Sequence, residues 1–171
     1  TLSASRAPDG SYSATPATIL DDGIYNAQAE QSDSATNTGS SGVTTFTIDR
    51  IAPTPTITEP AGGATLTTAA ATVAGGAGTA DGDSTTITIR IHAGAAAIGA
   101  PVQTFATTRL GDGSFSAVSP ALDNGIYTAV VSQTDAAGNV GQSGTATFTV
   151  AAPVIDQTAP IVTLTDPASG A

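Results

Sequence analysis

The sequence predicts an all-β protein made of β-sandwich repeats of about 100 residues each. Three observations favour this fold class. Apolar residues alternate with threonine in several short stretches, which is the pattern of strands with one buried face. Clusters of Gly, Asp and Asn separate these stretches, as turns do. Sequence motifs also recur: Leu-x-x-Gly-x-Tyr stands at residues 20–25 and again at residues 122–127.

The composition fits a globular β protein and excludes some classes of binding partner. Hydrophobic residues make up 40% of the 171 residues and aromatic residues only 4%, so we expect a thin core of Ala, Val and Ile. The net charge is -10, and the four basic residues are scattered arginines. Such a surface repels phosphate backbones and anionic membranes. We therefore expect neither a nucleic-acid partner nor membrane insertion.

The residue types that are missing exclude several chemistries. The chain has no Cys, so it forms neither disulfides nor thiolate metal sites. It has no Lys, which removes Schiff-base catalysis and a phosphate-loop lysine. The single His, His92, ends an Ile-rich strand, and we expect a surface residue rather than a catalytic base. We therefore do not expect an enzyme.

The first 50 residues match the second half of the following repeat. A turn followed by a strand at residues 9–13 recurs at residues 112–116. Tyr25 recurs 102 residues later as Tyr127. The sequence therefore predicts that residues 1–50 are the C-terminal half of one repeat.

The phrase Asp-x-x-Ala-Pro marks the boundaries between repeats. It stands at residues 49–53 and 156–160, and its prolines indicate a linker that leads into an edge strand. We therefore assign residues 51–152 to one complete repeat, and residues 153–171 to a linker and the first strand of the next repeat. The second linker is longer, because residues 151–155 are extra.

Within the complete repeat, alternation predicts strands at residues 71–75, 86–91 and 101–107. About seven strands in about 100 residues is the spacing of an immunoglobulin-like Greek-key sandwich. We expect tandem sandwiches of this kind, stacked end to end into a rod. The predicted core consists of Ile87, Ile89, Ile91, Phe105, Phe115, Tyr127, Val131, Phe148 and Val150.

The repeated Leu-x-x-Gly-x-Tyr phrase predicts a locked corner in each sandwich. The chain turns at the Gly, and the Tyr opens a strand while its hydroxyl bonds back to the loop backbone. The corner residues are Leu20, Gly23 and Tyr25 in the first copy and Leu122, Gly125 and Tyr127 in the second.

Together these phrases resemble the bacterial Ig-like repeats of large secreted and surface-anchored proteins, including giant repetitive adhesins. The resemblance rests on the Asp-Gly-Ser-[Tyr/Phe]-Ser turn, the tyrosine corner, a Gln-x-Asp-x-x-x-Asn loop, the Thr-Phe-Thr-[Ile/Val] strand and the Asp-x-x-Ala-Pro junction. It covers essentially the whole chain. It implies an extracellular spacer or adhesion module at a bacterial cell surface.

In some members of that group calcium stiffens the junctions, held by a linker Asp and by loop oxygens of the neighbouring module. The matching positions here are Asp33, Asn37, Asp49, Asp135, Asn139 and Asp156. Calcium takes six to eight oxygen ligands, so backbone carbonyls and water would complete the set. Turn chemistry is the alternative explanation of these residues, since Asp and Asn side chains cap turn backbones. Arg50, beside the first linker Asp, departs from an acidic junction.

We expect a non-enzymatic structural spacer in a long extracellular protein, such as an adhesin, a surface-layer protein or a filament component. A module that binds a glycan or a protein through its loops is the alternative. The expected partners are neighbouring Ig-like repeats of the same chain and, in a fibre or surface assembly, other copies. The spacer role requires no cofactor, and calcium is the candidate ion. The incomplete first repeat adds a further hypothesis, strand exchange between copies.

Overall fold

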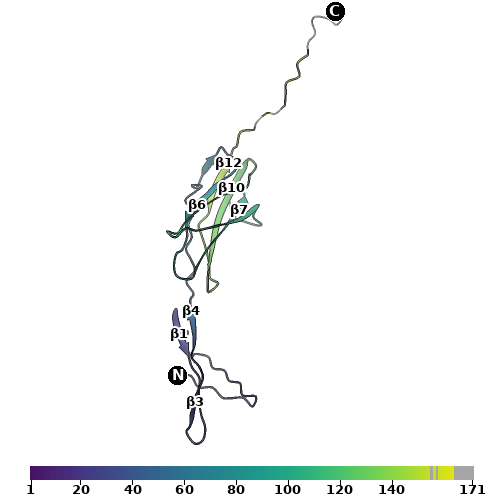
Figure 1. Cartoon of the computed structure of the whole chain (residues 1–171). Coiled ribbons are helices and arrows are strands. Elements are labelled where there is room, and N and C mark those ends of the chain that lie inside the picture. Colours follow the sequence, from purple (N-terminus) through teal and green to yellow (C-terminus); the bar gives the residue numbers. More distant parts are fainter. Residues whose placement is uncertain (155, 157, 164–171) are drawn as a thin grey trace, which may run out of the picture.

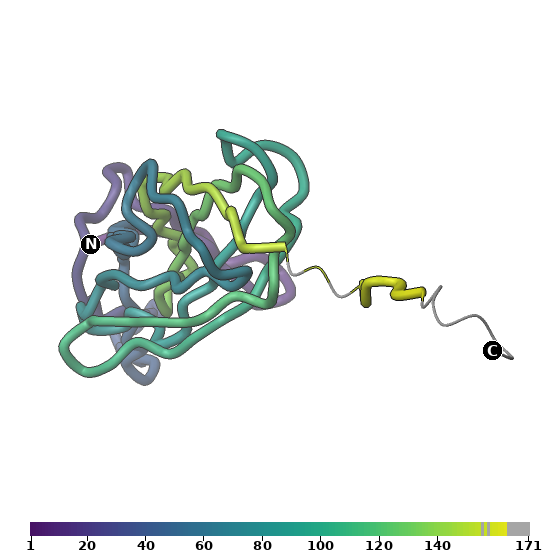
Figure 2. The backbone as a smooth tube through the Cα atoms, turned by 90° about the horizontal axis from the view of Figure 1, so that it is seen from above, coloured from purple at the N-terminus to yellow at the C-terminus, as the bar shows by residue number. Residues whose placement is uncertain are grey.

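The computed structural model describes residues 1–154, 156 and 158–163, and within them it is all β-strand and loop, as predicted (Figure 1). No helix in this part of the chain is long and apolar enough to cross a bilayer. Two bodies follow one another, the N-terminal unit (residues 1–48) and the sandwich unit (residues 56–152), and the linker at residues 49–55 joins them. In the view from above, the N-terminal unit lies behind the sandwich, so both share one long axis (Figure 2).

The N-terminal unit holds two short antiparallel pairs. Strand β1 (Gly23–Ala27) pairs with β4 (Thr44–Ile48), with Tyr25 opposite Phe46. Strand β2 (Glu30–Ser32) pairs with β3 (Thr38–Ser40) across a tight loop. These four strands form no second layer.

The sandwich unit has two layers. The larger sheet has the strand order β5-β12-β10-β7-β8, with β11 paired to β10, and the smaller sheet pairs β6 with β9. The larger sheet consists of β5 (Ala64–Leu66), β7 (Asp83–Ala93), β8 (Gln103–Thr108), β10 (Gly125–Asp135), β11 (Val140–Gln142) and β12 (Ala146–Val150). The smaller sheet consists of β6 (Thr72–Gly76) and β9 (Ser114–Val118).

The predicted edge strand after the first linker is only partly regular. Residues 56 to 58 run beside β6, with the Thr56 N–H donating to the Gly76 carbonyl at 2.8 Å and the Thr58 N–H to the Ala74 carbonyl at 2.9 Å. A single bridge, Glu59 to Ala74, completes this contact. The segment therefore covers the edge of the smaller sheet without becoming a full strand.

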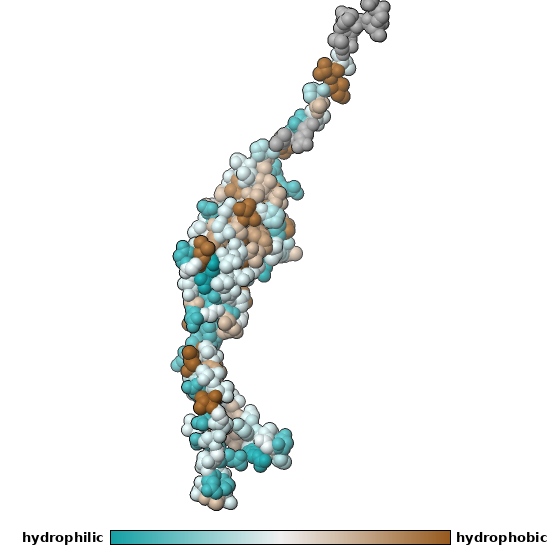
Figure 3. All heavy atoms as spheres, viewed as in Figure 1, coloured by the Kyte–Doolittle hydropathy of each residue, from teal (hydrophilic) through white to brown (hydrophobic). Residues whose placement is uncertain are grey.

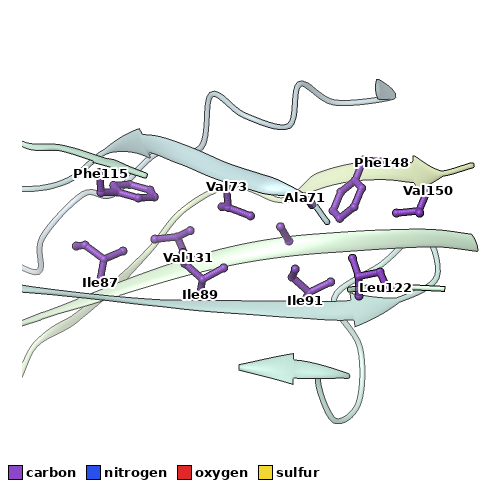
Figure 4. Packing of buried hydrophobic residues seen from close by; sticks show 11 residues of the cluster. Ala71, Val73, Ile87, Ile89, Ile91, Phe115, Leu122, Val131, Phe148 and Val150 are labelled. Carbon is purple, nitrogen blue, oxygen red and sulfur yellow. The ribbon is translucent and has the colours of Figure 1, made fainter. Parts of the chain in front are cut away.

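The core lies between the two sheets (Figure 4). Side chains of Ile87, Ile89 and Ile91 point from β7 toward Val73 and Phe115 of the smaller sheet. The predicted core is confirmed for seven of its nine members, which are buried, whereas Phe105 and Tyr127 pack against the core while only partly buried. The sequence pattern did not identify Ala71, Val73, Leu122 and Ala129, which are also buried.

Two local predictions were wrong. His92 is buried, because β7 continues to Ala93 and so places His92 inside the sheet, opposite Thr128. Residues 11–13 form no strand, although their turn is capped by Asp9. The equivalent residues of the sandwich unit form β9 by pairing with β6, and no strand stands in that place in the N-terminal unit.

The N-terminal unit exposes the side chains that the sandwich unit buries. Phe46 is 38% exposed and its counterpart Phe148 only 1%. Ala27 is exposed, and its counterpart Ala129 is fully buried. Brown apolar groups are visible on the narrow N-terminal unit, below the sandwich unit (Figure 3). This unit therefore lacks the opposing layer that would close a core.

Beyond Ala152 the described residues contain no strand. Ile161 and Val162, at the start of the predicted first strand of a next repeat, are 93% and 87% exposed. The rest of that predicted strand, from residue 164, lies outside the described residues.

The matched pair Phe148→Ala and Phe46→Ala tests this difference. Phe148→Ala should lower the free energy of unfolding of the sandwich unit by about 3 to 5 kcal/mol, because it empties a buried ring site. Phe46→Ala should lower the free energy of unfolding by less than about 1 kcal/mol, because that ring is already partly exposed to water. Urea unfolding followed by tyrosine fluorescence measures both, and similar losses for the two variants would contradict this account of the core.

Candidate functional site: the linker between the two units

The linker at residues 49–55 runs through a cradle on the sandwich unit. Pro53 and Pro55 are buried. A Cβ added to Gly141 would lie 1.7 Å from the Pro53 carbonyl oxygen, and one added to Gly78 would lie 3.1 Å from the Pro53 side chain. Only the absence of a side chain at Gly141 allows the two backbones to approach this closely. We call Gly78, Asn139 and Gly141 the linker cradle.

Asn139 fastens the linker by its side-chain amide. The amide nitrogen donates to the Asp49 carbonyl at 3.1 Å and to the Asp135 carboxylate at 2.8 Å. The Asn139 N–H donates to the other oxygen of the same carboxylate, also at 2.8 Å. The pKa of Asp135 is lowered, first because the Asn139 side chain donates to its carboxylate, while burial opposes this effect. The charged Asp135 therefore holds Asn139 aimed at the linker.

Gln133 positions the other wall of the cradle. Its side chain is only 1% exposed, and its oxygen accepts from the Gly78 N–H at 2.7 Å. Its amide nitrogen donates to the carbonyls of Gly78 at 2.9 Å and Ser84 at 2.7 Å. A buried amide with these partners is fully satisfied and fixes the loop that carries Gly78.

The N-terminal unit holds the linker from the other side. The Arg50 guanidinium forms an ion pair with Asp22, with 2.8 Å between Nε and Oδ1, and also donates to the Leu20 carbonyl. This contact lowers the pKa of Asp22, mainly through the Arg50 side-chain hydrogen bond. An exposed ion pair contributes little stability alone. Its place matters more, because it ties the linker to the corner loop.

In the sandwich unit, the equivalent corner loop binds the start of the following linker. Asn124, the counterpart of Asp22, donates to the Ala152 carbonyl at 3.0 Å and accepts from the Ala152 N–H at 2.8 Å. The corner itself contains the tyrosine contacts: Tyr25 donates to the Asp21 carbonyl at 2.8 Å, and Tyr127 to the Asp123 carbonyl at 3.0 Å. Each ring also stacks on the partner-strand phenylalanine, with centroids 5.7 Å and 5.9 Å apart.

The two-layer sandwich agrees with the family that the sequence matches. The family described as bacterial Ig-like domain matches residues 1–50 and 59–151 of the chain. The chain belongs to this bacterial Ig-like family. The resemblance seen in the sequence is confirmed, and with it the immunoglobulin-like sandwich. Ig-like domains of this kind are typically structural or binding modules rather than enzymes.

Two solved structures are similar to parts of this Ig-like chain. A crystal structure of an engineered protein is 27% identical, with a TM-score of 0.44, over 58% of this chain and 20% of its own length. The fibronectin(III)-like modules of CbhA from Clostridium thermocellum are 17% identical, with a TM-score of 0.41, over 78% of this chain and 64% of their own length. The chain thus spans less than two thirds of either structure. None of the curated proteins matches it.

The structure brings three of the predicted calcium ligands together, Asp49, Asp135 and Asn139, at the Ig-like junction. Asn139 donates from its backbone N–H and its side-chain amide to oxygen atoms of Asp135 and Asp49. The Asp49 carboxylate accepts from the Ile51 N–H at 3.0 Å. Among the residues that the structure describes, no three His, Asp or Glu side chains gather as a metal site.

The remaining predicted ligands lie apart from that junction. Asp33 accepts from the Asn37 backbone and side chain, both at 2.9 Å, in the β2–β3 loop at the far end of the N-terminal unit (Figure 1). Asp156 accepts from the Thr158 N–H at 2.8 Å, as Asp49 does from Ile51. Each of these acids caps a turn or linker backbone.

Sequence reasoning missed the contacts that hold the linker. Gly141, Gly78 and Gln133 were not identified as junction residues, and neither was the pairing of Arg50 with Asp22. One signal was present: the Gln-x-Asp-x-x-x-Asn phrase continues with x-Gly in both copies, ending at Gly39 and Gly141.

Gly141→Val should break the docked linker. The added side chain overlaps the Pro53 carbonyl, so we expect a loss of about 1 to 3 kcal/mol in the free energy of unfolding of the sandwich unit. Gly144→Val is the matched control, because a Cβ there meets no atom within 4 Å. Urea unfolding checks both variants, and equal stability of the two would show that the linker does not depend on Gly141.

Proposed function

We propose that this chain is a spacer segment of a long extracellular bacterial protein, such as an adhesin, a surface-layer protein or a filament component. Ig-like units follow one another in line, and their linkers are held so that the units keep a fixed direction. The role is mechanical and uses no catalytic group.

The clamped linker is the observation that carries this proposal. Arg50 bonds to the unit before the linker, and Asp49 and Pro53 contact the unit after it. Proline also fixes one backbone torsion at each of its positions, so little freedom is left for the linker. Two units joined in this way bend far less than units on a free linker.

The surface charge supports a spacer whose copies stay apart. The net charge of -10 is spread over turns and loops, which makes neighbouring molecules repel one another. The partners of the spacer are then the neighbouring Ig-like units of the same chain.

A ligand-binding role through loop tips has less support. The aromatic side chains within residues 54–150 are Phe105, Phe115, Tyr127 and Phe148, and each is buried or half-buried. None of these four rings lies exposed at a loop tip.

Small-angle X-ray scattering of the chain should give the long-tailed distance distribution of a rod. Gly141→Val should shorten the maximum dimension, because the released linker allows the units to swing toward each other. Gly144→Val should leave it unchanged. A compact distribution for the unaltered chain would overturn the spacer proposal.

Calcium at the junction is a separate hypothesis with its own test. Thermal unfolding in calcium chloride is compared with unfolding in a chelator, since an ion that binds only the folded state raises the Tm. The protein contacts already hold the linker, so we expect the same Tm in both. A higher Tm in calcium that is lost in Asp135→Asn would establish a junction ion.

A further inference from the structure

The chain crosses from one sheet of the sandwich unit to the other at residues 59–63. Residues 56–58 lie beside β6 of the smaller sheet, whereas the Gly63 N–H already donates to the Thr147 carbonyl of β12 at 2.7 Å. Pro60 has no N–H with which to continue the pairing to β6. Gly63 then turns the chain with a φ of 81°. After this turn the chain continues as β5, the last strand of the larger sheet.

This crossing leaves a groove between residues 58–61, β5 and residues 68–72. Its volume is about 480 Å³. Sites for small ligands have volumes of about 300 to 1,000 Å³. The apolar part of its lining includes Ala64, Leu66 and Ala70, each of them half-buried. Among the described residues, the other edge of β5 pairs with no strand. We call this space the crossing groove.

The polar lining of the crossing groove presents hydrogen-bond acceptors. The Thr58 hydroxyl donates to the Ala74 carbonyl at 3.3 Å, and the Thr68 hydroxyl donates to the Ala70 carbonyl at 2.9 Å. Because each hydroxyl hydrogen is used within the protein, these two groups offer a ligand only their oxygen lone pairs. A ligand that fits this lining therefore supplies hydrogen-bond donors.

Glu59 adds a negative charge to the same groove. Its backbone is held by two hydrogen bonds with Ala74, one in each direction, at 3.1 Å and 2.9 Å. The residue is exposed, and within the described residues its carboxylate takes part in no ion pair. The chain has 14 acidic and four basic residues, so its overall field also attracts cations. The ammonium of a lysine or the guanidinium of an arginine matches both the charge and the acceptors.

We propose that the crossing groove binds an extended peptide segment of another protein. A Lys or Arg side chain of that segment is directed at Glu59, and small apolar side chains pack against Leu66 and Ala70. The backbone of the segment pairs with the free edge of β5, as in β-strand addition. This site is separate from the spacer function, because it uses none of the residues that hold the linker.

The basic groups of this chain favour a partner from another protein. The chain has no Lys, and three of its four arginines are engaged within their own units. Arg50 is paired with Asp22, Arg90 donates to the Ser132 hydroxyl at 3.0 Å, and Arg109 donates to backbone carbonyls at the start of β7. The free edge of β5 favours a peptide, since only another backbone completes its N–H and C=O pairing.

The probe is the acetylated and amidated peptide Thr-Val-Lys-Val-Thr, and two control peptides carry Gln or Glu in place of Lys. Each peptide is titrated into the isotope-labelled full chain, and amide chemical shifts locate and quantify binding. Glu59→Gln removes the charge of the groove. Its matched control is Asp81→Asn, because Asp81 is an exposed acid in the loop between β6 and β7, outside the groove.

A second pair of variants tests the space itself. Ala61→Phe fills the groove, and Ala96→Phe places the same ring in the exposed loop between β7 and β8. Ala61→Phe should weaken the binding of all three peptides at least about tenfold, and Ala96→Phe should not change it. If Ala61→Phe fails to fold, which its spectrum shows, Glu59→Gln still decides the proposal.

The lysine peptide should shift the amide signals of Leu66, Ala70 and Thr72, and these shifts should saturate. It should bind about two- to fivefold more tightly than the glutamine peptide, which is the effect of one exposed ion pair. The glutamate peptide should bind most weakly. Glu59→Gln should abolish the preference for lysine, and Asp81→Asn should keep it.

Three results would overturn the proposal. The first is the absence of saturable shifts in the groove with any of the peptides. The second is the same preference for lysine in Glu59→Gln as in the unaltered chain. The third is a set of groove shifts that appears when the protein alone is concentrated, because a second copy would then be the occupant. The rod shape is measured separately by scattering, so none of these results bears on the spacer function.

Discussion

The contact of two backbones at Gly141 is the constraint on which the extended form of this chain depends. A peptide group of the linker lies where any side chain at position 141 would stand. The contact gains its direction from polar groups around it, because Asp135 orients Asn139 and Gln133 orients the Gly78 loop. Without these hydrogen bonds, Asn139 and the Gly78 loop would not be held in position against the linker prolines. The junction is therefore part of the folded sandwich rather than a tether between two folded bodies.

The pattern of side chains was sufficient to predict the strands that carry the core. Ile87, Ile89 and Ile91 alternate with polar residues, and such alternation is visible in one dimension because it reports on a single strand. Predictions that depend on which strand lies alongside were less accurate. His92 looks like a strand end until β10 is placed beside it, and residues 11–13 look like a strand until their missing partner is noticed.

In the candidate site, too, the sequence predicted the local motifs but not the contacts between distant segments. The sequence identified the Asp-x-x-x-Asn loop and the linker Asp, and the structure brings Asp49 and Asn139 into contact. It could not indicate which atoms meet, namely that the Asn139 side-chain amide donates to the Asp49 backbone carbonyl. Gly141 and Pro53 are also far apart in the sequence, so their close approach is a property of the folded sandwich alone.

The parallel pairing of β5 with β12 has a mechanical consequence. The Phe148 to Val150 strand runs in the same direction as the Ala64 to Leu66 strand, and the Ala151 N–H extends the pair by donating to the Leu66 carbonyl. The chain enters the unit along residues 56–58 beside β6, continues into β5, and leaves the unit from the end of β12. Tension on the two linkers therefore draws these strands past each other lengthwise. Their hydrogen bonds carry such a load together, instead of opening one after another.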